Sequence, residues 1–232
     1  MKTAGTSFRR MLNDSLGMQL YPSNLELRNN NKGWYLDNHE IVDKVKNDKE
    51  FNLNERRVVC GHYPYNLGGE ILSNPFYATF LREPVARTLS IIGHRKKLSP
   101  EFKDASVSEV LDKLDLMKRQ VTNYQTKIFA IDDFKLKYVN SEYFVGEKQF
   151  ELALNRLQKM DFIGLTEQFE TSVEIFKNKT GIALKDIQII NKGIDLTVEE
   201  EDIVRIKELV NYDILLYEEA LKLFEKQCNV IK

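Results

Sequence analysis

The chain opens with a loop of small and hydroxyl-bearing residues, Lys2-Thr3-Ala4-Gly5-Thr6-Ser7, that leads directly into a helical pattern. Apolar residues then recur at helical spacing until Gly17, namely Phe8, Met11, Leu12 and Leu16. Unpaired N–H groups at a helix start, the helix dipole and a nearby lysine attract an anion, and a glycine lets the backbone approach it. The loop therefore predicts a phosphate-type anion site, with a plain helix capped by Thr6 or Ser7 as the alternative interpretation.

The order of residues in this loop limits the kind of phosphate site. A Walker A loop has its lysine beside the Ser or Thr at the helix start, whereas here Lys2 comes first and Gly5-Thr6-Ser7 comes last. This order argues against an ATP- or GTP-hydrolysing P-loop. In α/β phosphate-binding folds a buried strand normally precedes such a loop, so we expect that first strand to be missing from the chain as given.

Short apolar runs alternate with helical patterns along the rest of the chain. The predicted strands are Arg57-Val58-Val59-Cys60, Phe76 to Leu81 and Phe162-Ile163-Gly164-Leu165. Helical patterns begin at Pro84, run through Met117 to Ile128, Phe150 to Leu157 and Phe169 to Phe176, and resume from about Thr197. This alternation predicts an α/β fold with a mostly parallel sheet, and 232 residues without an internal linker predict a single domain, 1–232.

The amino-acid composition limits the kinds of binding partner and the cellular compartment that we expect. A net charge of −1 gives no basis for nucleic-acid binding. Cys60 and Cys228 lie far apart and form no CxxC pair, which fits a reducing, cytoplasmic location better than a disulfide scaffold or a zinc site. No apolar run approaches the ~18 residues of a membrane span, so we expect no membrane segment. An anchor upstream of Met1 would instead indicate a Golgi or membrane-anchored origin.

A second candidate anion-binding element follows the strand predicted at Phe76 to Leu81. Arg82 stands at the strand end, Pro84 in the first turn of the next helix, and Ser90 two turns into that helix. A guanidinium fork and a hydroxyl placed in this way can grip one phosphate. The alternative is that Arg82 and Arg87 are solvated and that Ser90 only packs.

Gly61-His62, at the end of the first predicted strand, is the candidate for acid–base chemistry. Histidine is the side chain best suited to take a proton from an alcohol near neutral pH. Of the other two histidines, His39 lies in an acidic segment and His94 opens the basic run His94-Arg95-Lys96-Lys97. His62 is therefore the candidate general base, with a structural or surface histidine as the alternative.

Together these three stretches resemble the ordered motifs of PAPS-dependent sulfotransferases, most closely the carbohydrate type that includes heparan sulfate 2-O-sulfotransferase. That family has a PKTGGTS-like loop, then a histidine in a GH-type turn, then an RDPxxRxxS-like stretch. Three more segments are similar to its NxQT, VGLTE and DxxLYE segments: Asn123-Tyr124-Gln125-Thr126-Lys127, Phe162-Ile163-Gly164-Leu165-Thr166-Glu167 and Asp213-Ile214-Leu215-Leu216-Tyr217-Glu218. Asn191-Lys192-Gly193 falls where the family has a late loop that closes over the nucleotide.

The resemblance implies a P-loop-like three-layer fold, with a central mostly parallel sheet flanked by helices, and transfer of a sulfonate from PAPS to an acceptor hydroxyl or amine. It implies His62 as the general base and Lys2 as the cation that stabilises the leaving phosphate. The implied donor-binding residues are Lys2, Thr3, Ala4, Gly5, Thr6 and Ser7 for the phosphosulfate, Arg82 and Ser90 for the 3′-phosphate, and Asn191 and Lys192 in the closing loop. No metal is implied, and the sequence has no obvious cluster of metal-ligand residues.

Three departures from the family pattern bear on this resemblance. Met1 stands in place of the family's proline, and no strand precedes it. Glu83 replaces the usual aspartate but preserves its charge. The turn has His62 alone where the 2-O enzymes have two histidines, which weakens any inference to their particular sugar.

The acceptor and two other functions stay open. We expect a glycan or another hydroxyl-bearing small molecule as acceptor, by analogy with the family. Arg9-Arg10, Arg56-Arg57 and His94-Arg95-Lys96-Lys97 are candidates to line the path of an acidic glycan, with solvated faces as the alternative. The other functions are a P-loop-type nucleotide or small-molecule kinase, and a degenerate family member that binds a nucleotide or a partner protein without catalysis.

Overall fold

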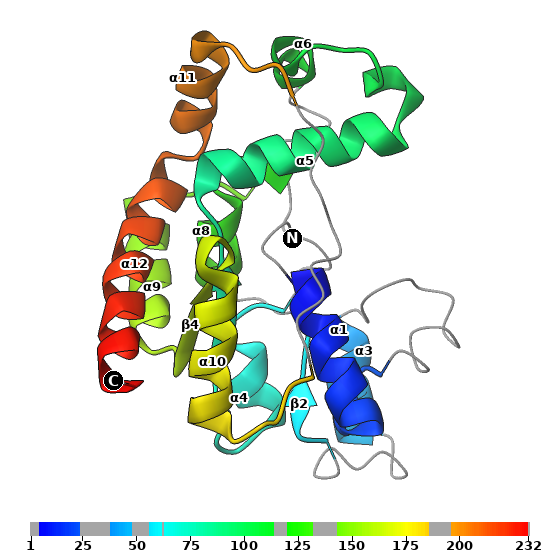
Figure 1. The fold of residues 1–232 in the computed structure, drawn as a ribbon, viewed down its shortest axis with the longest axis vertical. Coiled ribbons are helices and arrows are strands. Elements are labelled where there is room, and N and C mark those ends of the chain that lie inside the picture. Colours follow the sequence, from blue (N-terminus) through cyan, green and yellow to red (C-terminus); the bar gives the residue numbers. More distant parts are fainter. Residues whose placement is uncertain are drawn as a thin grey trace.

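The computed structural model describes residues 5–23, 38–47, 56–61, 63–113, 120–131, 143–185 and 196–231. In this part of the chain the protein is a mixed α/β structure that is mostly helical (Figure 1). Its strands form two small parallel sheets. The expected α/β class is therefore confirmed at this level. None of the helices in the described part combines the length and the apolar character that crossing a membrane requires.

The first sheet pairs β1 (Leu20–Tyr21) with β2 (Val58–Val59), and the second pairs β3 (Ala78–Leu81) with β4 (Phe162–Leu165). In the second sheet Ala78 lies opposite Phe162 and Leu81 lies opposite Leu165. Three of these strands match the predicted ones. β1 does not, because the residues after Gly17 carry no strand pattern of their own and pair only once β2 lies beside them.

The main hydrophobic core surrounds β3 and β4. All four residues of β4 are buried. Five helices contribute to this core: α1 (Gly5–Leu16), α8 (Tyr124–Ala130), α9 (Glu147–Gln158), α10 (Phe169–Thr180) and α12 (Asn211–Ile231). Phe8 of α1 packs on Phe80 of β3, with ring centroids 4.6 Å apart, and meets Phe176 of α10 edge-on at 5.0 Å. These aromatic contacts fix α1 against the second sheet.

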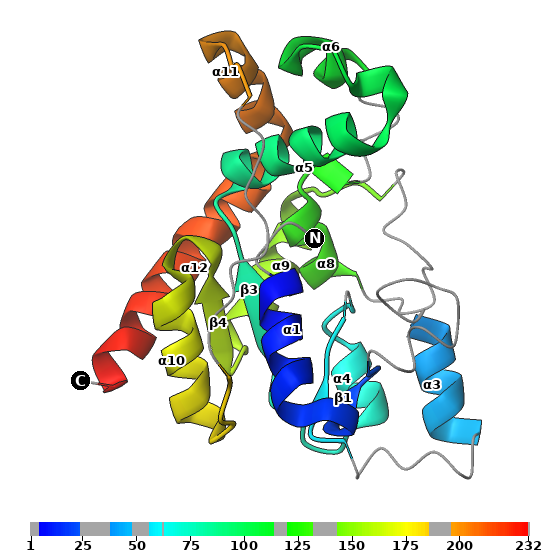
Figure 2. The same cartoon turned by 45° about the vertical axis from the view of Figure 1, so that its right-hand side comes forward.

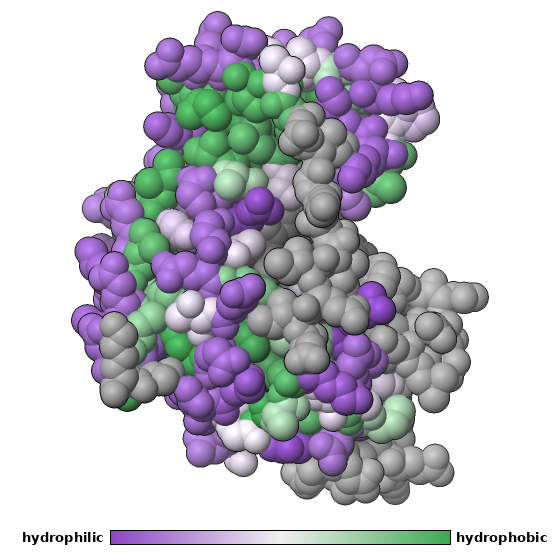
Figure 3. All heavy atoms as spheres, viewed as in Figure 1, coloured by the Kyte–Doolittle hydropathy of each residue, from purple (hydrophilic) through white to green (hydrophobic). Residues whose placement is uncertain are grey.

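A second cluster forms above this core, at the top of Figure 1. It joins α5 (Pro84–Leu98), the short 3-10 helix η3 (Pro100–Phe102), α6 (Val107–Asp112) and α11 (Glu200–Leu209). Figure 3 shows apolar surface in this upper region. Leu98 and Val204 are among its exposed apolar residues. α5 therefore connects the end of β3 to a second packing unit.

A third, smaller cluster lies beside the first sheet. Tyr21 of β1 and Ile41 of α3 (Asn38–Asn47) are both fully buried there. Ile71 of α4 (Leu67–Ile71) packs against them. The sequence pattern predicted neither α3 nor α4. The backbone of residue 39, in the acidic segment that contains His39, lies in α3. The remaining elements are the 3-10 turns η1 (Gly17–Gln19) and η4 (Thr166–Gln168).

Two predicted helix boundaries are confirmed by their local chemistry. Gly17 ends α1 with φ +53°, a conformation that glycine adopts without a steric cost. Pro84 occupies the first turn of α5, where its missing N–H leaves no hydrogen bond unmade. The helix expected through Met117 to Ile128 is only partly confirmed. α8 begins at Tyr124, because Asn123 has φ 44° and breaks the helical run, and Met117 lies outside the described residues.

Glu83 caps α5 and supplies one test of the local structure. Its carboxylate accepts hydrogen bonds from the N–H groups of Val85 and Ala86 at 3.0 and 2.6 Å. We expect Glu83→Ala to lower the free energy of unfolding by about 0.5–2 kcal/mol, the usual cost of losing a helix cap. Glu83→Asp keeps a carboxylate at the cap and should stay close to the wild type. Urea denaturation of the three proteins tests this, and an equal loss in both variants would contradict a capping role.

Candidate functional site

The structure describes five of the predicted site residues: Gly5, Thr6, Ser7, Arg82 and Ser90. The other six lie outside the described residues, namely Lys2, Thr3, Ala4, His62, Asn191 and Lys192. Figure 2 places the start of α1 on the side of the molecule toward which β3 runs. Arg82 directly follows β3 on that same side. Two of the predicted anion-binding elements therefore face the same end of the second sheet.

α1 begins at Gly5, one or two residues earlier than expected. Thr6 and Ser7 lie in its first turn instead of preceding it as caps. Thr6 is exposed and Ser7 is buried. The first N–H groups of a helix have no partner within the helix itself, which is the arrangement that an anion site uses.

Arg9, one turn into α1, anchors the helix to the ends of both strands of the first sheet. The side chain is buried, and its guanidinium donates to the carbonyl of Cys60 at 2.6 Å and to the carbonyl of Pro22. Because Arg9 is buried, it does not belong to a solvated face, which was the alternative interpretation of Arg9-Arg10. Instead it holds α1 against the chain just before Gly61.

Gly61 allows the chain to turn sharply after β2. A Cβ atom at Gly61 would lie 2.3 Å from the ring of Tyr63, so a larger residue would displace that ring. Burial raises the pKa of the Tyr63 hydroxyl and of the Cys60 thiol, and Arg9 opposes both shifts. Both groups are therefore neutral at physiological pH. Position 62 follows in the sequence, but His62 itself is outside the described residues.

Arg82 is held at the end of β3 by the side chain of Gln125. Its backbone N–H donates to Oε1 of Gln125 at 3.0 Å, and its carbonyl accepts from Nε2 of Gln125 at 2.9 Å. Its guanidinium forms an ion pair with Glu167, with Nε and Oε1 3.8 Å apart. Both backbone groups of Arg82 are therefore satisfied, and its charged side chain, 27% exposed, lies at the surface beside Glu167.

Glu167 connects Arg82 to two further elements. Its Oε1 accepts the backbone N–H of Glu83 at 3.2 Å, and its Oε2 accepts the hydroxyl of Tyr217 in α12 at 2.8 Å. Burial, with the Glu167 carboxylate beside it, raises the pKa of Tyr217, so this hydroxyl remains a donor. Thr166, the neighbour of Glu167, donates its hydroxyl to the carbonyl of Leu81 at 3.0 Å.

Asp213 fixes the start of α8, which carries Gln125. This carboxylate is 1% exposed and accepts from the backbone N–H of Gln125 at 3.1 Å. It also accepts the N–H and the hydroxyl of Thr126 at 2.7 and 2.8 Å. Asn123 in turn accepts the backbone N–H groups of Tyr212 and Asp213 at 3.0 and 3.2 Å. The beginnings of α8 and α12 are therefore locked together.

Arg87 is buried, which corrects the reading of Arg82 and Arg87 as a solvated pair. It is 1% exposed, donates to the carbonyl of Gln120 at 3.0 Å and lies 4.4 Å above the ring of Tyr124. Burial lowers the pKa of Arg87, whereas burial raises the pKa of Asp213; each charge opposes the shift of the other. Arg87 is therefore enclosed in the interior, where its Nε and Nη1 have no hydrogen-bond partner among the described residues, and it is not part of an exposed phosphate grip.

Ser90 lies on α5, two turns after Arg82, and is half-buried. α5 begins two residues after Arg82, which directly follows β3, and Ser90 lies in this helix as the sequence predicted. The structure thus keeps Arg82 and Ser90 on consecutive elements.

Several of the basic residues proposed to line an acceptor path already have partners within the protein. Arg10 pairs with Asp14 at 3.9 Å, and Arg95 donates to the side chain of Gln120 at 3.1 Å. Lys96 donates to a backbone carbonyl, as does Arg56. These contacts tie parts of the basic runs to the rest of the fold, and Lys97 is exposed.

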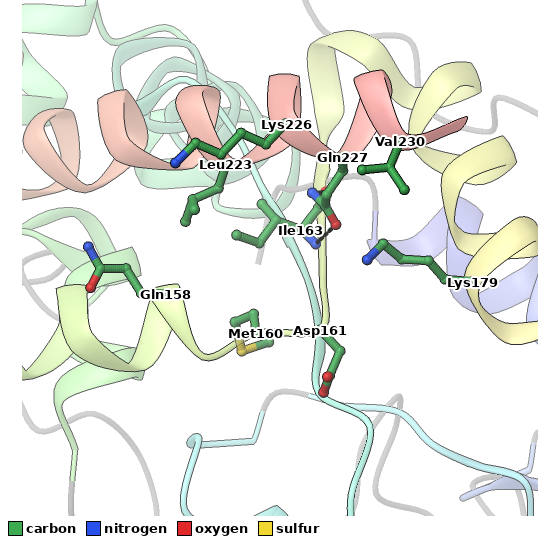
Figure 4. A pocket seen from close by; sticks show the side chains of 9 residues that line it. All are labelled: Gln158, Met160, Asp161, Ile163, Lys179, Leu223, Lys226, Gln227 and Val230. Atoms are coloured by element: carbon green, nitrogen blue, oxygen red, sulfur yellow. Dashed lines mark hydrogen bonds between the residues drawn. The ribbon is translucent and has the colours of Figure 1, made fainter. Parts of the chain in front are cut away.

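A cavity of about 220 Å³ lies beside the start of β4, at the opposite end of the second sheet from Arg82. Figure 4 shows its lining, which includes Lys179 of α10, Lys226 of α12 and Asp161. No predicted site residue lines it. Within the described ranges no group of three His, Cys, Asp or Glu side chains is placed to hold a metal ion.

Gln125, Glu167 and Asp213 are the residues that the predicted site omitted. All three stand in the segments for which the sequence suggested a resemblance to the sulfotransferase family. That resemblance was the available signal, since nothing in the local pattern marks Gln125 as a partner of Arg82 or Asp213 as a partner of Gln125. Comparison with protein-family models, with curated proteins and with solved structures gave no match.

Proposed function

We propose that this protein transfers a sulfonate group from PAPS to a hydroxyl or amine of an acceptor, which is a carbohydrate or another hydroxyl-bearing small molecule. The convergence of separate segments on Arg82 carries the proposal. Gln125, Glu167 and Asp213 come from three stretches far apart in the sequence, and hydrogen bonds join all three to the end of β3 or to one another. These are the stretches that resemble the family's NxQT, VGLTE and DxxLYE segments.

The arrangement of elements supports a P-loop-like three-layer fold for this function. Both described sheets are parallel, and α1 begins within the Lys2-Thr3-Ala4-Gly5-Thr6-Ser7 segment, at Gly5. The first turn of α1 and the end of β3 face the same side of the molecule (Figure 2). A nucleotide with one phosphate group at each end can bridge two such anion-binding elements.

The proposed reaction depends on positioning of the reactants and on stabilisation of charge more than on covalent catalysis by the protein. Sulfonate transfer is an in-line displacement like phosphoryl transfer, with a loose transition state. Lys2 and the N–H groups at the start of α1 stabilise the charge on the leaving phosphate. Arg82 and Ser90 bind the 3′-phosphate, and Asn191 and Lys192 close over the nucleotide. His62 accepts the proton of the attacking hydroxyl.

Nucleotide binding tests the proposed function directly. PAP, the desulfonated product, should raise the melting temperature of this chain. At a hundred times its Kd a ligand adds about 2.7 kcal/mol of stability, which corresponds to roughly 5–10 °C for a protein of this size. A shift with ATP and Mg²⁺ in place of PAP would favour the kinase alternative. No shift with either nucleotide would contradict the proposed function.

Arg82→Ala tests the assignment of the 3′-phosphate site. Loss of a charged hydrogen-bond partner is expected to weaken PAP binding by about 10- to 100-fold, as measured by titration calorimetry. Arg205→Ala is the matched control. Arg205 is 32% exposed and pairs with Asp112 at 2.6 Å, so it resembles Arg82 in exposure and pairing but lies on α11. An equal loss in both variants would argue against a specific role for Arg82.

A further inference from the structure

Gln125 has an unusual place for a side-chain amide. It is 2% exposed, lies in the first turn of α8, and uses both ends of its amide on the two backbone groups of Arg82. This double hydrogen bond resembles one step of strand pairing, made by a side chain instead of a strand. It begins where the paired residues of β3 and β4 end, at Leu81 and Leu165.

The backbone that carries this amide is itself fixed by hydrogen bonds. The backbone N–H of Gln125 donates to Asp213, and that carboxylate also binds Thr126. On the other side of the chain, Thr166 binds the carbonyl of Leu81, the residue before Arg82. The backbone from which the Arg82 side chain emerges is thus fixed on two sides by buried or half-buried groups.

We propose that Gln125 is a positioning residue for Arg82: its amide sets the backbone of Arg82 so that the guanidinium points at the 3′-phosphate of the nucleotide. The inference rests on the proposed function, because it assumes that this phosphate is the ligand of Arg82. Gln125 does not touch the nucleotide. It acts by restricting the conformations that the backbone of Arg82 can adopt. A misplacement of a binding group by about 1 Å can reduce its effect by as much as 100-fold.

The protein contains a matched control for this role. Gln227 of α12 makes the same double hydrogen bond with Ile163 in the middle of β4, accepting its N–H at 3.2 Å and donating to its carbonyl at 3.0 Å. Figure 4 shows Gln227 beside Ile163, which lies opposite Thr79 of β3. Gln227→Met removes an equivalent support of a strand without affecting the backbone of Arg82.

The experiment compares two nucleotides that differ by one phosphate. Titration calorimetry measures the affinities of PAP and of adenosine 5′-phosphate for the wild type, Gln125→Met and Gln227→Met. Gln125→Met should reduce the affinity for PAP about 10-fold or more and leave that for adenosine 5′-phosphate unchanged, because only PAP carries the 3′-phosphate. Gln227→Met should leave the ratio of the two affinities at the wild-type value. A merely structural role would lower both affinities together or neither.

The outcomes separate the inference from the function on which it rests. A wild type that does not prefer PAP over adenosine 5′-phosphate overturns both. A wild type that prefers PAP, with the same preference in Gln125→Met, overturns the positioning role alone. If Gln125→Met does not fold, Gln125→Asn takes its place, since it keeps an amide but withdraws it from Arg82 by one methylene. Its ratio of affinities should fall in the same direction, and an unchanged ratio again overturns the positioning role.

Discussion

Replacement of His62 by alanine is expected to slow sulfonate transfer by about 10²- to 10⁴-fold, the usual contribution of a general base. The affinity for PAP should remain nearly that of the wild type, because a base acts on the acceptor and not on the nucleotide. Radiolabelled PAPS with the glycan or small alcohol on which the wild type is most active measures the transfer rate. Titration calorimetry with PAP measures the affinity.

His94→Ala is the control for this experiment. His94 is exposed on α5, and the proposed mechanism gives it no role. Its replacement should leave both the rate and the affinity at wild-type values. A large loss of PAP affinity in His62→Ala would instead place His62 in the nucleotide site, and a rate equal to that of the wild type would exclude it as the base.

Asp213→Ala is expected to have the largest effect on stability, a loss of about 3–5 kcal/mol in the free energy of unfolding. The carboxylate accepts three hydrogen bonds from the start of α8, at Gln125 and Thr126, and all of these groups are buried. Removing it leaves three buried donors without a partner and leaves the Arg87 guanidinium without the nearby negative charge. Urea denaturation followed by circular dichroism measures the loss.

Asp112→Ala provides the comparison. Asp112 is a carboxylate that accepts from Arg205, but its side chain is 65% exposed. Exposed ion pairs contribute little, so the expected change is within about 1 kcal/mol. If the two variants lost the same amount, the buried contacts of Asp213 would not be the source of its effect. A near-neutral Asp213→Ala would mean that the starts of α8 and α12 are held by other contacts, such as those of Asn123.

Elements with a strong local pattern were predictable. Pro84 and Glu83 mark the start of α5, and Gly17 marks the end of α1, because proline, a capping carboxylate and a glycine each act on their immediate neighbours. Phe162–Leu165 is a continuous apolar run, and it forms a fully buried strand as such a run predicts.

Elements whose stability depends on distant partners were not predictable. β1 has two residues and exists through its pairing with β2, nearly forty positions away. α3 is short, and Ile41 becomes buried only when it meets Tyr21. The burial of Arg87 was also missed, because an arginine on a helix face is usually solvated and only the packing of Tyr124 and Asp213 around it shows otherwise.

The amino-acid sequence by itself determined which residues are candidates for anion binding and proton transfer: a lysine and hydroxyls around a helix start, an arginine at a strand end, and a histidine after a glycine. These are properties of residue type and spacing, and they need no tertiary contact to be recognised. Only the tertiary structure decided that Arg82 is held by Gln125 and Glu167, while Arg87 is enclosed. The reason is that both arginines follow the same strand in the sequence, and their roles differ only in which distant side chains the fold brings to each of them.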